Sequence, residues 1–339
     1  MRRIIGFLFL TGLLLGQTPS TGDVVVGSGN FSPIVADLEK SLAFYNDLLG
    51  AMPATTPAWS TDSALLNFLG VPSAQLRFSS VRIPGSTMRV EIVEFKDIDR
   101  KAAQARLQDP GATRLILIVR DVDTLLAHLK ERSVRVVTAG NAPVKLETTA
   151  FKGRAVVVKD PDGFFVELRQ PDVLPESTAP ATSNVMDARV GVTIDDTDKS
   201  MRFYRDVLAL QPQVSPAFVS DKAMMDVLGT GGAQVRLSTV VVPGSRLVVE
   251  FAEFKGIDRK PIGVRIQDPG ATRLQLRVKD TDAAVKVMTA AGGVVVTTGG
   301  NGGPIDMQGL RVAIVRDLNN LFIVTMAGGQ AAPRPARGI

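Results

Sequence analysis

Three polar residues, Arg273, Gln275 and Arg277, alternate with apolar residues in the segment 272–278. Successive side chains of a β-strand point to opposite faces, so these three would share one face of a strand. A guanidinium group is planar and always charged, and it suits paired contacts with a carboxylate. The pattern therefore predicts a polar strand face that is either solvated or bound to an anionic or carbonyl-bearing ligand.

The residue types that the chain lacks exclude several kinds of chemistry. It has no cysteine and one histidine, His128. Disulfides, thiolate zinc sites and cysteine nucleophiles are therefore excluded, and so is an iron site built from two histidines and a carboxylate. The formal net charge is +5, its basic residues are spread along the chain, and aromatic residues make up only 5% of it. Clustered basic residues mark nucleic-acid binding, so we expect no nucleic-acid partner.

The chain repeats itself. Residues 94–115 read EFKDIDRKAAQARLQDPGATRL, and residues 253–274 read EFKGIDRKPIGVRIQDPGATRL. Sixteen of these 22 positions match at a constant offset of 159, which slips to 157 between Asp160 and Asp317. This indicates a tandem duplication. We expect the shared segment either to edge a cleft or to join the two copies.

The repeat sets the predicted domain boundaries, and 339 residues suffice for two domains. Copy one covers residues 24–170, and copy two covers residues 187–326. Residues 171–186 between them are rich in proline, serine and threonine and predict a linker. Residues 327–339 lack periodicity and aromatic residues, which predicts a disordered tail.

The N-terminus has the pattern of a secretory signal. Arg2 and Arg3 precede an almost wholly apolar run at 4–15, and residues 16–22 are small and polar. The alternative is a membrane anchor, but the run is shorter than the roughly 20 residues that span a bilayer. We therefore expect residues 1–22 to be a signal peptide, with no stable membrane anchor after its cleavage and a periplasmic or extracellular location.

Each copy divides into two similar halves. In the first half of copy one we expect a strand at 30–36, a helix at 38–49, and strands at 75–83 and 88–95. Asp37 is placed to cap the helix, and Gly50 to end it. The second half repeats this order with a strand at 114–120, a helix through Arg132, and strands at 155–159 and 164–169. Each half is therefore a β-α-β-β-β unit, and copy two has the same layout.

The segments VADLEKSLAFYNDLLG, IVRDVDTLLAHLKERSVRV and VVKDPDGFFVELRQP resemble the vicinal-oxygen-chelate superfamily. This superfamily includes glyoxalase I, extradiol dioxygenases, methylmalonyl-CoA epimerase and bleomycin-resistance proteins. The resemblance covers both copies. It implies an α+β fold of two tandem domains, each built from paired βαβββ modules that form an eight-stranded open barrel with its helices outside.

The resemblance also implies a cleft with four metal-ligand positions, commonly two histidines and two carboxylates or a glutamine. A metal there would act as a Lewis acid on two adjacent substrate oxygens. The matching residues in copy one are Asn30, Glu91, Arg114 and Glu167, and those in copy two are Arg189, Glu250, Arg273 and Val324. Copy one therefore keeps two carboxylates and neither histidine, and copy two keeps one carboxylate beside two arginines.

These replacements argue against a metal cofactor. An all-oxygen Mg²⁺ or Ca²⁺ site from Asn30, Glu91 and Glu167 is conceivable. Arg114, a fixed cation in the same ring, opposes it, so we predict no metal. His128 belongs on the outer surface of a helix, away from the cleft.

The arginines have two interpretations. In the first, Arg114 pairs with Glu91 or Glu167, and Arg273 pairs with Glu250, which compensates buried charge without any function. In the second, at least one arginine faces an open cleft and binds a ligand. The candidate cleft residues are then Asn30, Arg114, Arg189, Glu250, Arg273, Gln275 and Arg277.

Three functions remain. The leading one is metal-free binding of a small molecule, possible in either cleft, as the bleomycin-resistance branch suggests. The second is a glyoxalase-like lyase or isomerase with Glu91 or Glu167 as a catalytic base and an atypical metal or none. The third is a structural or interaction role, with both clefts filled by ion pairs. An enzyme predicts a carboxylate of raised pKa facing open space in copy one. A binding protein predicts an open cleft in either copy with an unpaired arginine, and a structural role predicts no cavity.

Overall fold

The computed structural model describes residues 24–52, 55–299 and 302–328. The predicted signal peptide, residues 1–22, lies outside them, and so does the predicted tail from residue 329. Residues 327 and 328 are not a tail, because they end the last strand, β17 (Phe322–Gly328). Within the described ranges, no helix has the length and apolar character needed to cross a membrane.

The predicted elements of copy one are confirmed. Its strands and helices are β1 (Val25–Val35), α1 (Leu38–Leu49), α2 (Ser63–Phe68), β2 (Gln75–Arg82), β3 (Arg89–Lys96), β4 (Thr113–Val119), α3 (Val122–Glu131), β5 (Arg135–Val136), β6 (Val144–Glu147), β7 (Lys152–Lys159) and β8 (Phe165–Pro171). Asp37 accepts a hydrogen bond from the backbone N–H of Lys40 at 3.0 Å, and Gly50 takes a positive φ of 63°. Local capping chemistry therefore sets both ends of α1.

Copy two repeats this order with one added short strand, β10 (Gln213–Val214). Its elements are β9 (Val185–Thr193), α4 (Thr197–Arg202), β10 (Gln213–Val214), α5 (Lys222–Leu228), β11 (Gln234–Val241), β12 (Val248–Lys255), β13 (Thr272–Val278), α6 (Thr281–Ala290), β14 (Val294–Val295), β15 (Ile305–Met307), β16 (Leu310–Arg316) and β17. The small helix before the second strand, α2 or α5, is a feature that the sequence pattern missed.

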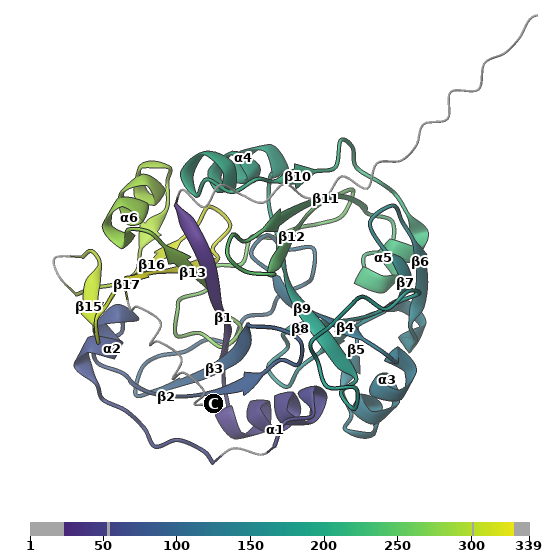
Figure 1. The fold of residues 1–339 in the computed structure, drawn as a ribbon, viewed down its shortest axis with the longest axis horizontal. Helices are drawn as coiled ribbons and strands as arrows, with labels where there is room; N and C mark the ends of the chain where they lie inside the picture. Colours follow the sequence, from purple (N-terminus) through teal and green to yellow (C-terminus); the bar gives the residue numbers. More distant parts are fainter. Residues whose placement is uncertain (1–23, 53–54, 300–301, 329–339) are drawn as a thin grey trace, which may run out of the picture.

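The two sheets exchange modules between the copies (Figure 1). Sheet A has the strand order β14-β16-β17-β13-β1-β3-β2, and β15 pairs with β16. Sheet B has the order β10-β11-β12-β9-β4-β8-β7-β5, and β6 pairs with β7. Paired βαβββ modules are thus confirmed, but each sheet joins the first module of one copy to the second module of the other. Residues 24–170 and 187–326 mark sequence repeats rather than separate sheets.

The short connection between the copies has a part in this exchange. It runs from the end of β8 to Asn184, whose side-chain oxygen accepts the backbone N–H groups of Arg120 and Asp121 at 3.0 and 2.9 Å. These residues follow β4 directly, so β9 begins beside the end of β4 and pairs antiparallel with it. Strand β1 is left to pair antiparallel with β13.

The best-repeated segment joins the two copies, which is one of its two predicted roles. Thr113 and its equivalent Thr272 are hydrogen-bonded to each other at 2.7 Å. Asp109 accepts the backbone N–H of Lys260 at 2.8 Å, and Asp268 accepts that of Lys101 at the same distance. Because each contact recurs with the copies reversed, both copies must hold the same residues here.

One apolar core joins all four modules. It lies against α1, α3, α4 and α6, and includes Tyr45 and Tyr204, each almost wholly buried. Two smaller clusters occupy the opposite side of the sheets, one under α2 on sheet A and one under α5 on sheet B. We call these opposite sides face A and face B; both carry candidate functional residues.

Candidate functional site

The exchange of modules separates residues that the sequence grouped by copy. Face A carries Asn30 and Glu91 from copy one with Arg273 and Gln275 from copy two. Face B carries Arg114 and Glu167 from copy one with Arg189 and Glu250 from copy two. The predicted residues are therefore brought together, but in two sets that each draw on both copies.

Face B is closed by a cluster of alternating charges. Arg114 Nε donates to Glu167 Oε2 at 2.7 Å, and Arg169 Nε donates to Glu167 Oε1 at 2.6 Å. Arg169 also makes a two-pronged contact with Glu250, both bonds being 2.8 Å, and Arg189 Nη1 reaches Glu250 Oε1 at 2.9 Å. All four carboxylate oxygens of the cluster thus accept hydrogen bonds from arginines.

The electrostatics of face B keep both carboxylates ionised. Burial of Glu250 opposes its ionisation, but the guanidinium of Arg169, with Arg189 and Arg114, lowers its pKa to about 2. Burial opposes ionisation of Glu167 too, and Arg169 and Arg114 outweigh it and lower its pKa. Glu167 is 1% exposed. A buried, paired carboxylate of lowered pKa is a poor base, so the raised pKa expected of a catalytic carboxylate is not found at Glu167.

Arg169 was not among the predicted residues. It lies two residues after Glu167 in β8 and therefore shares its strand face, a signal that was present in the sequence. The predicted pairing of Arg114 with Glu167 is confirmed. The predicted pairing of Arg273 with Glu250 is wrong, because these residues stand on different sheets.

Face A is centred on Glu91 of β3. Its Oε1 accepts from Ser32 Oγ at 3.0 Å, from Arg273 Nη2 at 3.2 Å and from Gln275 Nε2 at 3.2 Å. Its Oε2 accepts from Asn30 Nδ2 at 3.3 Å. Ser32 was not predicted, although it follows Asn30 by two residues on the same face. Face A therefore has one carboxylate, one guanidinium in contact with it, and three neutral donors.

Arg273 is incompletely paired. It is 3% exposed, and its buried Nε finds no acceptor among the described residues. Burial lowers the pKa of Arg273, and the charge of Glu91 acts in the opposite direction. In face B the equivalent nitrogen, Nε of Arg114, is bonded to Glu167. The offset of 157 places Val324 at the position of Glu167, and an apolar side chain accepts no hydrogen bond.

The outer part of face A is open to solvent. Phe78 in β2 is 47% exposed, and Arg277 in β13 is exposed. Arg89 and Met326 are half-buried, and Arg89 donates to the hydroxyl and the backbone carbonyl of Ser80, at 3.0 and 3.3 Å. The polar face predicted for the segment 272–278 is therefore solvated at Arg277 and buried at Arg273.

The residues at the ligand positions do not fit a divalent metal. Among the described residues no group of three or more histidine, cysteine, aspartate or glutamate side chains could hold an ion. Glu91 and Glu167 stand on different sheets, so the ion considered between Asn30, Glu91 and Glu167 has no shared site. Each carboxylate is in contact with a guanidinium, a fixed cation that competes with a metal ion for the same oxygens.

The only histidine in the chain lies apart from both faces, as predicted. His128 is in α3, and its Nε2 is 2.8 Å from Asp47 Oδ2 of α1. This contact joins α3 to α1. It explains the histidine without a role in binding.

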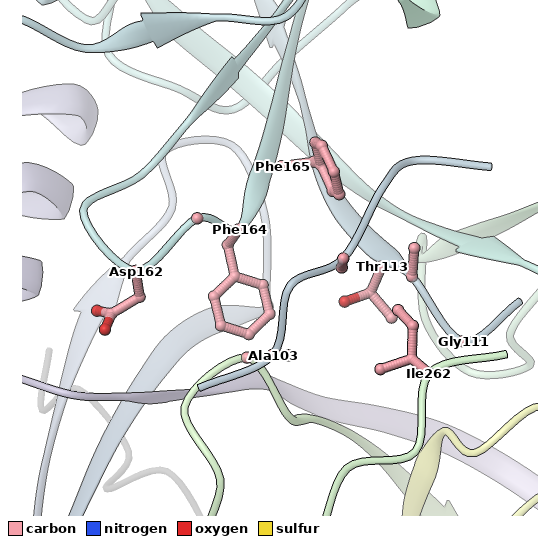
Figure 2. Close-up of a pocket in the computed structure, with 11 residues that line it drawn as sticks. Ala103, Gly111, Thr113, Asp162, Phe164, Phe165 and Ile262 are labelled. Carbon is pink, nitrogen blue, oxygen red and sulfur yellow. The ribbon is translucent and has the colours of Figure 1, made fainter. Parts of the chain in front are cut away.

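Two cavities lie outside these charged centres. One, at the junction of the copies, is lined by Phe164, Phe165, Ile262 and small residues, and Asp162 points away from its centre (Figure 2). The carboxylate of Asp162 instead binds the backbone N–H of Ala36 and the hydroxyl of Ser41. A second cavity, of about 500 Å³ with its opening, is bounded by Phe322 of β17. Phe322 lies on face A, at the register partner of Arg273.

Comparison with known proteins supports the resemblance. Residues 30–168 match the family model of the Glyoxalase/Bleomycin resistance protein/Dioxygenase superfamily. Glyoxalase I from Zea mays has a similar structure, with a TM-score of 0.57 at 14% identity, over 89% of this chain and 92% of that one. A putative dioxygenase from Bacillus subtilis gives 0.53 at 13%, over 90% and 86%. No curated protein matches the chain. At such identities the structures show a common fold alone.

Proposed function

Because residues 30–168 match the family model of the Glyoxalase/Bleomycin resistance protein/Dioxygenase superfamily, and copy two repeats them, we propose that this protein binds a small molecule on face A without a metal ion. A fold of this kind hosts many functions, so the residues of the site must decide between them. The observation that carries the proposal is the incomplete pairing of Arg273, a buried cation on a face whose outer part is exposed.

Face B supports a structural role. Its carboxylates are fully occupied by three arginines, and Arg114 and Glu167 are buried. A ligand entering there would have to displace charge-assisted hydrogen bonds, which are the stronger kind in proteins. The ion pairs of face B thus support the structural role there, and the incomplete pairing of Arg273 supports binding on face A.

A lyase or isomerase is the weaker alternative. Glu167 is buried and held ionised, and Glu91 already accepts hydrogen bonds from four side chains. A general base must reach the proton that it abstracts with a free lone pair. Binding of a ligand does not require a free lone pair on Glu91, so the geometry of face A favours binding over catalysis.

The two faces offer a matched experiment. Ser80 is the register partner of Glu91, and Thr239, its equivalent by the offset of 159, is the register partner of Glu250. We expect Ser80→Trp to block face A and abolish binding of small molecules from an acid and neutral fragment library, measured by calorimetry in the presence of a chelator. Thr239→Trp should leave binding intact. If neither variant changes binding, or if no fragment binds the wild-type protein, face A is not the site.

We also propose that the protein is exported. The support is the pattern of residues 1–22, which lie outside the described structure. N-terminal sequencing of protein recovered from the periplasm and the medium tests this, and a full-length chain that stays in the cytoplasm would contradict it.

A further inference from the structure

We propose that the ligand of face A is an organic carboxylate with an apolar body, whose carboxylate accepts a hydrogen bond from Nε of Arg273 beside Val324. The inference rests on the proposed function and names the chemical class of its ligand. The ligand would supply to Arg273 the carboxylate acceptor that Glu167 supplies to Arg114 on face B.

The two arginines occupy the same place in their sheets. Arg114 is the register partner of Phe165 in β8, and Arg273 is the register partner of Phe322 in β17. Two residues further along these parallel strands stand Glu167 and Val324. The carboxylate that faces the first guanidinium therefore has an apolar counterpart beside the second.

The internal carboxylate of face A does not complete the pairing. Glu91 Oε1 contacts Arg273 only through Nη2, at 3.2 Å, and shares that oxygen with Ser32 and Gln275. Nε remains buried without an acceptor among the described residues. Buried polar groups in proteins are nearly always hydrogen-bonded, so the unpartnered Nε of Arg273 indicates an acceptor that comes from outside the chain.

The charges of face A favour an anion. Along β1, β3, β13 and β17 its charged side chains are Arg89, Arg273, Arg277 and Glu91, three cations and one anion. Arg89 and Arg277 lie toward the exposed end, where they can attract a negatively charged molecule. A carboxylate is the anion that matches a planar guanidinium best.

The apolar body follows from the neighbours of Val324. In β8 the next side chain on the same strand face as Glu167 is Arg169. The equivalent side chain after Val324 in β17 is Met326. Met326 is the register partner of Val312 in β16, and both belong to the apolar cluster under α2. Met326 is half-buried, so a ligand whose carboxylate reaches Arg273 from this side would lay its remaining atoms on Met326, at the edge of this cluster.

The first test compares acids with their amides on the wild-type protein. Hexanoate and benzoate are titrated against hexanamide and benzamide by calorimetry at neutral pH. We expect each acid to bind at least tenfold more tightly than its amide, because the amide is uncharged. Equal affinity within each pair would overturn the inference, and if Ser80→Trp still blocked the amides, the proposed function would survive that result.

The second test supplies the missing carboxylate from the chain. Val324→Glu is expected to remove the preference for acids, since the new side chain occupies the place of the ligand. Val324→Met adds bulk without an acceptor, so it should weaken acid and amide alike and keep the preference. Retention of the preference in Val324→Glu would contradict the inference. Should that variant not fold, Arg273→Lys keeps the charge, removes Nε and is expected to lose at least tenfold in acid affinity.

Discussion

Face A and face B are built from equivalent strands, yet one is closed by its own charges and the other is not. The replacements at two positions of the last strand account for much of the difference: Glu167 and Arg169 on face B are Val324 and Met326 on face A. On face B these two side chains connect Arg114 to Glu250 through a continuous chain of ion pairs. Without them, Arg273 keeps one partial contact, with Glu91. A constant scaffold thus yields a closed or an incompletely paired charged centre according to a single acid–base pair.

The largest expected effect comes from converting face B into face A. Glu167→Val removes the partner of two buried guanidinium groups and should cost about 3–5 kcal/mol of unfolding free energy, measured with urea. The double variant Glu167→Val with Arg169→Met removes one charge of each sign and should be less destabilised than the single variant. It also frees Nε of Arg114.

The same double variant should gain a second site for hexanoate. Calorimetry would then report two carboxylates per chain in place of one, and Ser80→Trp would abolish only one of them. If the double variant is as unstable as Glu167→Val alone, then removing Arg169 relieves no unpaired charge. That result would show that the ion pair of Arg169 with Glu250 compensates Arg169 without Glu167. If the double variant still binds one hexanoate per chain, Arg114 cannot bind a carboxylate in the way proposed for Arg273.

A second comparison concerns the buried tyrosine of each copy. Tyr45 donates to Asp160 and Tyr204 donates to Asp317, both at 2.9 Å. Burial raises the pKa of Asp160 to about 7, and the nearby charge of Asp162 adds to this. Burial also raises the pKa of Asp317, whose neighbour at the equivalent position is the uncharged Asn319. The two sites therefore differ in one adjacent charge.

We expect the stability of the protein to fall as the pH rises from about 4.5 to 7.5. The folded state holds the Asp160 proton more tightly than the unfolded state, so its contribution is present at low pH and lost as pH passes through the raised pKa, up to about 3 kcal/mol. Asp160→Asn should flatten this slope, measured as unfolding free energy against pH. Asp162→Asn should flatten it in part, and an unchanged slope in both variants would mean that Asp160 is ionised throughout.

Much of the fold could be predicted because its signals are local. Asp37 and Asp121 cap their helices through bonds to residues two or three positions ahead, so the sequence alone places those helix starts. The exchange of modules could not be predicted. Pairing β4 with β1 or with β9 buries similar apolar residues, and the choice depends on contacts such as that of Asn184 with Arg120, between residues 64 positions apart.

The candidate site was predicted residue by residue but not as a set. Glu91 and Arg273 lie at the positions that the family resemblance gave, because strand alternation fixes which face they share with their neighbours. Their contact with each other was missed, since it crosses between copies. The missing acceptor of Arg273 Nε could be predicted only by comparing Val324 with Glu167. That comparison requires knowing which modules share a sheet.

Equivalent substitutions at the junction of the copies should have equal effects on stability, unlike equivalent substitutions on face A and face B. Asp109 and Asp268 each bind an arginine three residues before them and a backbone N–H of the other copy. Asp109→Asn and Asp268→Asn should therefore cost similar amounts, about 2 kcal/mol each, as loss of hydrogen bonds to charged groups does. Urea unfolding of both variants tests this. Unequal losses, beyond about 1 kcal/mol, would mean that the junction shares the asymmetry of the two faces.

The smallest expected effect lies at the edges of the two sheets. Trp59 has Arg77 and Lys96 each 4.5 Å from its ring, whereas the equivalent Phe218 has only Lys255, at 4.0 Å, among cations near its ring in the described residues. Trp59→Phe makes the first site resemble the second and should cost about 0.5–1 kcal/mol, as an exposed cation–π contact does. Circular dichroism must follow the unfolding, because the variant removes the only tryptophan of the chain. A loss well above this range would show that Trp59 packs as part of sheet A, so that the edges differ in burial as well as in cation contacts.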